Sequence, residues 1–209
     1  MAKIESFERH SDAYDDWFDR HCDLYEAELT AVRRMLPSAE ADCLEVGVGS
    51  GKFAGPLGIR IGVDPSPSMA LKAREVGVDV LLGVAEDLPI ADARFDWVLM
   101  VTTICFVDDV DRSLREVSRV LRPHGCIVVG FVDRESSLGR SYEAKRERSR
   151  FYKDATFFSV QEVVSHLARA RFRTASMVQA LIPGTSPGVI AEGTGEGAFV
   201  VIKGVREPA

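Results

Sequence analysis

Apolar runs alternate with amphipathic segments along most of the chain, and this alternation predicts an α/β fold. Five runs are typical of buried strands, and they cover residues 42–46, 59–63, 78–84, 95–101 and 126–132. The amphipathic segments between them predict helices, such as one that begins after Asp109 and ends near Leu121. Strands that alternate with helices in this way form a mostly parallel sheet with helices on both faces.

The segments before and after this core add further elements. Residues 5–36 place aromatic and aliphatic side chains at helical spacing, and residues 172–182 and 198–205 resemble two final strands joined by a Gly/Pro-rich loop. Residues 133–158 are polar and basic, with interspersed aromatic residues. We therefore expect one domain over residues 1–209, with an N-terminal helical cap at 1–40 and a helical insertion at 133–158.

Composition and charge narrow the possible partners. The chain has 209 residues, of which 46% are hydrophobic and 28% charged, as in an ordinary globular protein. Its net charge of −6 disfavours a nucleic-acid partner. We expect no membrane partner either, because no apolar run is long enough to span a bilayer and the N-terminus is too polar for a secretory signal. Four cysteines without C-x-x-C spacing indicate a reduced, cytoplasmic protein without a metal site. The oligomeric state stays open.

The strongest chemical signal lies in residues 42–64. Gly47, Gly49 and Gly51 recur at every second position after the first apolar run, where glycine lets the backbone turn sharply and approach a ligand. Asp64 ends the second apolar run. A carboxylate at the end of a second strand can accept hydrogen bonds from both ribose hydroxyls of a nucleoside. This unit therefore predicts a site for an adenosine-like ligand.

The spacing of the glycines differs from that of a dinucleotide site. In G-x-G-x-x-G the third glycine would stand at position 52, which is Lys52. Glu45 precedes the turn, where a carboxylate would repel a pyrophosphate and attract an ammonium or sulfonium group. Both observations count against a nicotinamide-dependent oxidoreductase, which stays the less favoured alternative.

The pattern Glu45-x-Gly47-x-Gly49-x-Gly51 resembles motif I of the class I S-adenosylmethionine-dependent methyltransferases. Residues 84–90 resemble the D-A-E-x-L-P-F run of that family, with Val84 in place of the leading aspartate, and residues 121–125 resemble its L-[KR]-P-G-G turn. The resemblance is closest to the type 11-like enzymes that act on small molecules, and it is carried by residues 40–132. It implies a Rossmann-like, seven-stranded, mostly parallel sheet with an antiparallel C-terminal strand.

The resemblance also implies where the cofactor lies. Glu45 and the glycine turn would hold its methionine part, Asp64 its ribose, and Met69, Ala85 and Glu86 its adenine, while Tyr14 folds over it and the turn after Val101 lies beside the methyl group. The expected cofactor-binding residues are Tyr14, Glu45, Gly47, Gly49, Gly51, Asp64, Pro65, Met69, Ala85, Glu86, Val101 and Thr102.

The expected reaction is methyl transfer from S-adenosylmethionine to a small-molecule acceptor, with S-adenosylhomocysteine as the product. Such enzymes mainly align the acceptor, the methyl group and the sulfur, so no fixed catalytic set follows from the sequence. Candidate bases are His10, His21, Tyr14 and Asp133. The basic insertion at 133–158 favours an anionic acceptor with Tyr142 or Tyr152 along its apolar part; a solvated basic face is the plain alternative. A non-catalytic, cofactor-binding regulatory protein is also compatible with these motifs.

Overall fold

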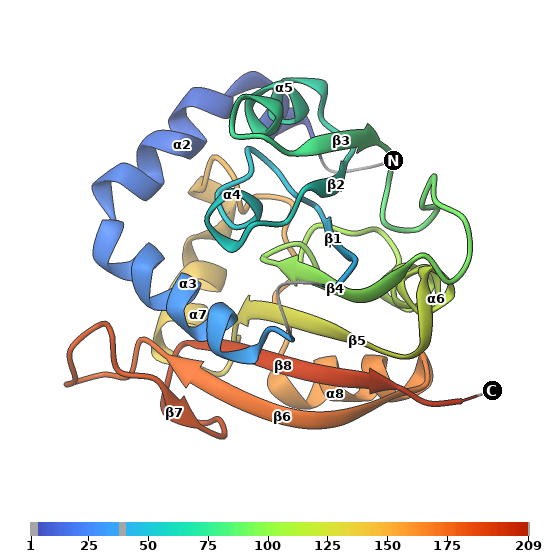
Figure 1. Ribbon diagram of the computed structural model, residues 1–209. Coiled ribbons are helices and arrows are strands. Elements are labelled where there is room, and N and C mark those ends of the chain that lie inside the picture. The colour runs from blue at the N-terminus through green and yellow to red at the C-terminus, as the bar shows by residue number, and fades with distance from the viewer. Residues whose placement is uncertain (1–3, 38–40, 209) are drawn as a thin grey trace.

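The fold is built on one twisted sheet, seen in a computed structural model that describes residues 4–37 and 41–208. Within these residues eight strands follow the order β3-β2-β1-β4-β5-β8-β6-β7 across the sheet (Figure 1). The strands are β1 (Cys43–Val46), β2 (Ile61–Asp64), β3 (Asp79–Leu82), β4 (Phe95–Val101), β5 (Leu121–Val132), β6 (Phe172–Ala180), β7 (Ala191–Glu192) and β8 (Phe199–Arg206).

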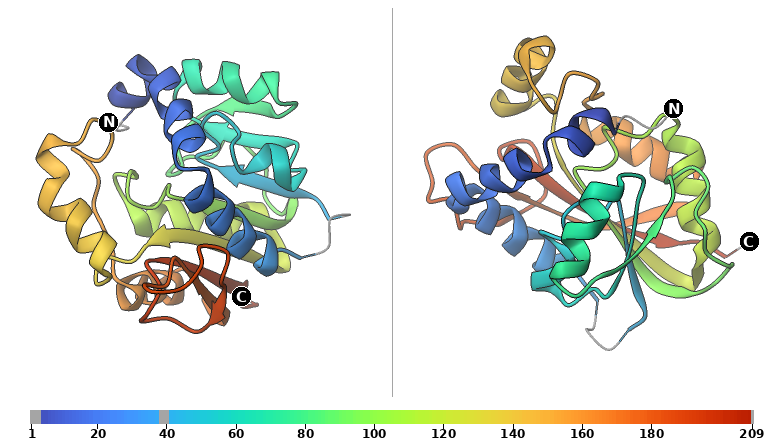
Figure 2. Two further views of the ribbon diagram at one scale, coloured as in Figure 1. Left: turned by 90° about the vertical axis from the view of Figure 1, so that its left-hand side faces the viewer. Right: turned by 90° about the horizontal axis from the view of Figure 1, so that it is seen from above.

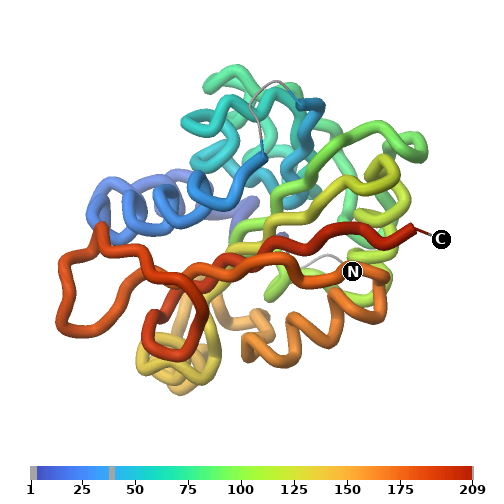
Figure 3. Tube along the Cα trace, turned by 60° about the horizontal axis from the view of Figure 1, so that its bottom comes forward, coloured from blue at the N-terminus to red at the C-terminus, as the bar shows by residue number. Residues whose placement is uncertain are grey.

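The first five strands pair in parallel, as their alternation with helices predicts. β8 inserts antiparallel between β5 and β6, and Figure 3 shows it running between these two neighbours. The expected antiparallel C-terminal strand is therefore confirmed. One strand was not expected: β7, a two-residue strand within the Gly/Pro-rich segment, pairs with the outer edge of β6 and makes the sheet eight-stranded.

Helices cover both faces of the sheet. α3, α4 and α5 pack on one face through a cluster that includes Val32, Ala54 and Ala73, while α6 and α8 pack on the other through Leu114 and Leu167. The helices are α1 (Glu5–Arg9), α2 (Ser11–Arg20), α3 (Cys22–Met35), α4 (Ala54–Leu57), α5 (Pro67–Glu75), α6 (Val110–Val120), α7 (Ser137–Lys145) and α8 (Val160–Arg169). None of the helices in the described residues is long and apolar enough to cross a membrane.

Two segments differ from a simple helical prediction. The N-terminal segment forms three helices, because the backbone leaves the helical region at His10 and again at His21. The helix after the glycine turn is a single turn, α4, and it ends at Gly58 in the left-handed conformation with φ of 72°. Short, bent elements of this kind bring side chains from the first helices across the end of the sheet.

The insertion after β5 stands opposite the N-terminal helices. α7 and the 3₁₀ turn Arg146–Arg148 follow β5 and lead, through a loop, into α8. In Figure 2 (left) α1 and α2, in blue, and α7, in yellow, border the side of the molecule at which β4 and β5 end. In parallel sheets the ligand crevice lies at this carboxyl edge.

Candidate functional site

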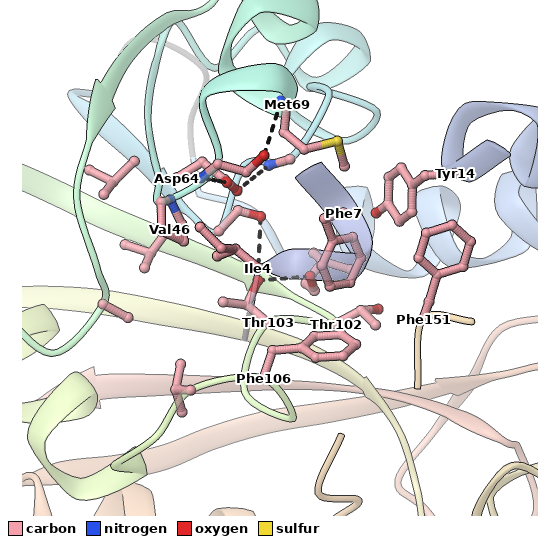
Figure 4. Close-up of a pocket in the computed structure, with 18 of the residues that line it drawn as sticks. Ile4, Phe7, Tyr14, Val46, Asp64, Met69, Thr102, Thr103, Phe106 and Phe151 are labelled. Atoms are coloured by element: carbon pink, nitrogen blue, oxygen red, sulfur yellow. Dashed lines mark hydrogen bonds between the residues drawn. The ribbon is translucent and has the colours of Figure 1, made fainter. Parts of the chain in front are cut away.

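A single pocket at the carboxyl edge of the sheet gathers most of the residues predicted from the sequence (Figure 4). Every expected cofactor-binding residue except Glu45 and Gly51 lines it: Tyr14, Gly47, Gly49, Asp64, Pro65, Met69, Ala85, Glu86, Val101 and Thr102. Side chains from α1, α2, α3, the loop after β4 and the insertion complete the walls. The pocket therefore joins elements that are far apart in the sequence.

The glycine turn forms the floor of the pocket through its backbone. Gly47 and Gly49 have φ of 74° and 53°, in the left-handed region that favours glycine. A Cβ at Gly47 would lie 2.3 Å from Thr103 Oγ1, so no side chain fits there. A Cβ at Gly49 would enter the space between Met69 Cε, at 3.5 Å, and the Tyr14 ring, at 3.9 Å. That space is open to a ligand because the residue is glycine.

Asp64 ends β2 inside the pocket, and the backbone fixes its carboxylate. Its Oδ2 accepts the N–H of Gly49 at 2.8 Å, and its Oδ1 accepts the N–H of Ser66 at 2.9 Å. Burial raises the pKa of Asp64, while the two N–H donors act in the opposite direction. Each carboxylate oxygen can accept more than one hydrogen bond. Asp64 can therefore bind two hydroxyl groups while it holds the glycine turn in place.

Glu45 and Gly51, both expected at the cofactor, lie outside the lining of the pocket. Glu45 is 1% exposed behind the glycine turn, where the N–H of Ala54, the first residue of α4, donates to its carboxyl group. Burial raises the pKa of Glu45 well above its usual range, which favours the uncharged form. Gly51 packs its turn against α5, where a Cβ would lie 2.7 Å from Val76 Cγ2. Both residues shape the turn from behind.

The N-terminal helices close over this side of the pocket through polar contacts. Asp15 on α2 accepts a hydrogen bond from Ser50 in the glycine turn at 2.6 Å and pairs with Lys72 on α5 at 3.0 Å. Glu8 on α1 accepts the N–H of Ser68 at 3.2 Å. These contacts place the neighbouring Tyr14 ring against the pocket, as Figure 4 shows, and burial raises the pKa of its hydroxyl.

The expected adenine side is an apolar slot closed by one carboxylate. Met69, Val84 and Ala85 line it together with Glu86. The carboxylate of Glu86 is hydrogen-bonded: its Oε1 accepts the N–H of Asp108 at 2.6 Å. Glu86 thereby ties the end of the slot to the loop that precedes α6. A flat apolar slot with few polar groups suits a purine ring.

The end of β4 carries a strained residue at the centre of the pocket. Thr102 has φ of 52°, which is unusual for a β-branched residue, and its N–H donates to the Gly130 carbonyl at 2.8 Å. Thr103 follows, and its hydroxyl donates to the Val101 carbonyl at 3.0 Å. Strained backbone of this kind is concentrated at functional sites. Here it turns the chain away from β4 at the point where the two halves of the pocket meet.

The far half of the pocket is aromatic and was only partly predicted. Tyr142 and Tyr152 line it, as expected for the insertion, and their rings stack with centroids 5.1 Å apart. Phe106 stacks on Tyr152 at 6.0 Å. Phe7 contacts Phe106 at 4.9 Å and Phe151 at 5.5 Å, and Figure 4 shows these rings gathered opposite Asp64. The sequence did not single out Phe7, Phe106 or Phe151 as neighbours.

An acidic side chain completes the same wall. Glu28, on α3, is 8% exposed and lines the pocket. Sequence reasoning missed it, although a signal was present: Glu28 falls between Tyr25 and Val32 on the apolar stripe of α3, three residues after one and four before the other. A carboxylate on a buried helix face is costly unless it is paired or used.

Of the expected candidate bases, Tyr14 alone is among the described residues that line the pocket. His10 lies exposed at the junction of α1 and α2, and His21 stacks on Trp17 with ring centroids 4.7 Å apart. Asp133 is buried and accepts the N–H of Glu135 at 3.0 Å, outside the pocket. His10, His21 and Asp133 are therefore not placed to act on a bound acceptor.

The basic residues of the insertion also lie elsewhere. Arg134 pairs with Glu162 at 2.9 Å, and Arg146 donates to the Ala155 carbonyl at 3.3 Å. Among the described residues that line the pocket there is no Lys or Arg, while Glu28, Asp64, Glu86 and Asp108 are acidic. The charge of the pocket therefore does not match the anionic acceptor that the sequence favoured.

The residues present fit S-adenosylmethionine. The space above Gly49, the fixed carboxylate of Asp64 and the apolar slot at Met69 would receive the methionine part, the ribose and the adenine in turn. These three features lie along one continuous pocket that ends at the aromatic wall. A second, smaller molecule can therefore be held next to the cofactor.

Comparisons with known proteins agree with this geometry. A family model described as a methyltransferase domain matches residues 44–129. A Thermotoga maritima crystal structure, described as a SAM-dependent methyltransferase and possible histamine N-methyltransferase, is 48% identical, covers 98% of this chain and 100% of its own, and has a TM-score of 0.93.

Two more distant relatives extend the picture. An uncharacterized protein of Methanocaldococcus jannaschii is 39% identical over 94% of this chain and 96% of its own length. The methyltransferase in a complex with the Haloferax volcanii Trm112 methyltransferase activator is 21% identical, with a TM-score of 0.74 over 100% of this chain and 99% of its own. At that identity the likeness concerns the fold alone.

Proposed function

The chain belongs to the S-adenosylmethionine-dependent methyltransferases, and from this premise we propose that it methylates a small molecule held between the cofactor and the aromatic wall of the pocket. The observation that carries the proposal is the continuity of one pocket from Asp64 to Tyr152. A small acceptor fits because residues of the N-terminal helices and of the insertion both line the pocket.

The roles of the residues follow from their places. Asp64 binds the ribose hydroxyls, the backbone of Gly47 and Gly49 supports the methionine part, and Met69 with Ala85 borders the adenine. Glu45 does not line the pocket, and we assign it the role of supporting the glycine turn through the N–H of Ala54. We assign residues 4–37 the role of a cap over the cofactor, since Glu8 and Asp15 tie these helices to the residues that flank Asp64.

The cofactor supplies a methyl group already activated by a sulfonium centre, so the protein contributes alignment and a dry environment. Thr102 and Thr103 border the point at which the two halves of the pocket meet. The rings of Phe7, Phe106 and Phe151 cover that point and exclude water. The Thermotoga maritima relative, described as a possible histamine N-methyltransferase, supports an acceptor of small size.

Calorimetry and a transfer assay test this function together. We expect the protein to bind S-adenosylhomocysteine, and to bind neither NAD nor NADP at the same concentration. With labelled S-adenosylmethionine and a mixed library of small amines, phenols and carboxylic acids, label should pass to at least one compound. Binding without transfer to any acceptor class would leave the protein as a cofactor-binding regulator and contradict the proposal.

A further inference from the structure

Glu28 is a buried carboxyl group without a partner in the described part of the chain. It is 8% exposed, and no described residue donates a hydrogen bond or an ionic contact to it. Burial raises the pKa of Glu28 to about 8. Two other acids of the pocket differ in this respect, because Asp64 and Glu86 are held by backbone N–H groups.

Aromatic rings line the same pocket as this carboxyl group. Burial is the main cause that raises the pKa of the hydroxyl groups of Tyr14, Tyr142 and Tyr152, and the charge of Glu28 acts on each of them in the same direction. These three phenols, from α2, α7 and the loop after it, are the titratable groups that face it. Tyr142, Tyr152 and Phe106 form a stack of rings, and the faces of such rings attract a cation.

A carboxylate beside stacked aromatic rings is the chemistry that recognises an organic ammonium group. The carboxylate compensates the charge, and the rings replace water around the carbon-bound face of the cation. The described lining of the pocket contains no Lys or Arg, so no positive side chain there would repel a cation. This also favours an ammonium group as the ligand. An anionic acceptor would instead lose its hydration next to Glu28 without gaining a counter-charge.

We propose that the methyl acceptor is a small primary or secondary amine, and that Glu28 both binds its nitrogen and removes the proton that must leave before methylation. This inference rests on the proposed function, since it names the substrate class of the same pocket. Glu28 is then the group that touches the reacting nitrogen, and the ring stack of Phe106, Tyr142 and Tyr152 holds the carbon skeleton of the amine.

The reaction balances with Glu28 as the proton acceptor. The amine enters as an ammonium ion, and the Glu28 carboxylate takes one of its protons, which frees the lone pair of the nitrogen. The nitrogen then forms a bond to the methyl carbon while the carbon–sulfur bond breaks and its electron pair stays on sulfur. The product leaves as a methylammonium ion, and Glu28 returns its proton to solvent. A carboxyl group with a pKa of about 8 is closer to an amine in basicity than an exposed glutamate is.

Binding measurements can separate this proposal from its alternatives. Three sets of ring-matched probes carry an amine, an alcohol or a carboxylate: tyramine, tyrosol and 4-hydroxyphenylacetate; tryptamine, tryptophol and indole-3-acetate; histamine, histaminol and imidazole-4-acetate. Calorimetry with the protein saturated in S-adenosylhomocysteine should show binding of at least one amine, with its alcohol and carboxylate at least about tenfold weaker. Preferred binding of the alcohol or the carboxylate throughout would overturn the inference.

Glu28→Gln keeps the shape of the side chain and removes its ability to carry a negative charge and to accept a proton. We expect the affinity for the amine to fall at least about tenfold and kcat/KM to fall about 10²- to 10⁴-fold, as for loss of a general base. The matched control is Glu26→Gln on the exposed face of the same helix, which should change neither value. Unchanged affinity for S-adenosylhomocysteine in both variants will show that the fold and the cofactor side are intact.

The pH profile distinguishes a base from a residue that only shapes the pocket. In the native protein kcat/KM should rise with pH, because the proton shared by Glu28 and the amine must be lost before methylation. In Glu28→Gln this limb should move to higher pH, toward the pKa of the free amine. A lower rate with the limb in its original place would contradict the role of Glu28. If the library assay shows methylation of alcohols or carboxylic acids only, the proposed function stands and the amine inference falls.

Discussion

The two halves of the pocket are built in different ways. The cofactor half is made largely from backbone: the positive φ angles of Gly47 and Gly49 and the N–H groups that hold Asp64 lie within one short stretch of chain. The acceptor half is made from side chains that arrive from four separate segments, and they are Phe7, Glu28, Phe106, Tyr142, Phe151 and Tyr152.

This difference explains which half can be shared among many enzymes. Backbone geometry binds parts that every S-adenosylmethionine molecule has, so it needs only glycine at fixed places and one acid. A wall of side chains can change its size and charge without disturbing the sheet, because its residues lie on helices and loops around the edge. Substitutions in the first half should therefore weaken cofactor binding, and substitutions in the second should change acceptor use alone.

Gly47→Ala should have the largest effect. A Cβ would lie 2.3 Å from Thr103 Oγ1 at a φ of 74°, so the turn must move. Overpacking costs about 1–3 kcal/mol and left-handed backbone about 1–2 kcal/mol. If the turn must recover this strain when the cofactor binds, affinity for S-adenosylhomocysteine should fall about thirtyfold to a few thousandfold. Calorimetry and thermal unfolding will measure both.

Gly184→Ala is the matched control for the cost of placing alanine in the left-handed backbone conformation. Gly184 has φ of 79°, but a Cβ added there would meet nothing within 4 Å, so only the conformational cost applies. We expect a small loss of stability and unchanged cofactor affinity. If Gly47→Ala behaves like this control, the cofactor half does not depend on the close fit of its backbone.

Asp64→Ala should rank second. It removes a carboxylate that accepts the N–H groups of Gly49 and Ser66 and, as proposed, two ribose hydroxyls. Charge-assisted hydrogen bonds contribute about 1.5–3 kcal/mol each, so affinity for S-adenosylhomocysteine should fall roughly tenfold to several hundredfold. The control is Asp79→Ala, at the exposed opposite end of β3. If Asp64→Ala has unchanged affinity for S-adenosylhomocysteine, the proposal that Asp64 binds the ribose is wrong.

Sequence patterns could predict the cofactor half because local spacing encodes it. Apolar runs located the strands of the parallel sheet, and the spacing of Gly47, Gly49 and Asp64 located one wall of the pocket. The same reasoning put Glu45 in contact with the ligand, which stays a prediction, although Glu45 does not line the pocket. A residue's position before a turn does not say how deeply its side chain is buried, and Glu45 is 1% exposed with the N–H of Ala54 as its donor.

The acceptor half could not be assembled from sequence alone. The proximity of Phe7 to Phe106 and Phe151 depends on how α1 and the insertion fold back over the sheet, which no local spacing records. Basic residues dominate the composition of the insertion, yet none of those in the described residues lines the pocket, whereas Tyr142 and Tyr152 do. Composition describes a segment, whereas function here depends on which side of the segment faces the ligand.

The pH dependence of stability offers a third test, which concerns Glu28. We expect this test to change the free energy of unfolding and to leave cofactor binding intact. The pKa of Glu28 is about 8 in the folded protein and ordinarily 4.5. Between these values the unfolded chain has lost the proton that the folded protein keeps, so this group makes stability fall as pH rises. The slope is about 1.4 kcal/mol per pH unit and the total up to about 4 kcal/mol between pH 5 and 8.

Urea unfolding at pH 5, 6.5 and 8 will measure this contribution as a difference between variants. Relative to the native protein, Glu28→Gln should gain stability as the pH rises, because an amide has no proton to lose. Glu26→Gln, exposed on the same helix, should follow the native protein at each pH. Parallel curves for the native protein and Glu28→Gln would show that Glu28 is not protonated at neutral pH in the fold.

Charge reversal at Arg148 should have the smallest effect, and it addresses the expectation of an anionic acceptor. Arg148 is exposed in the 3₁₀ turn and does not line the pocket. Exposed charges are screened within about 10 Å at 0.1 M salt, so Arg148→Glu should change KM for the acceptor and affinity for S-adenosylhomocysteine less than about twofold. Tyr142→Ala, in the same insertion, should weaken acceptor binding because it removes a ring from the stack. If Arg148→Glu weakens acceptor binding as much as Tyr142→Ala does, the insertion acts through its charge, and the division between a backbone-built and a side-chain-built half has to include long-range electrostatics.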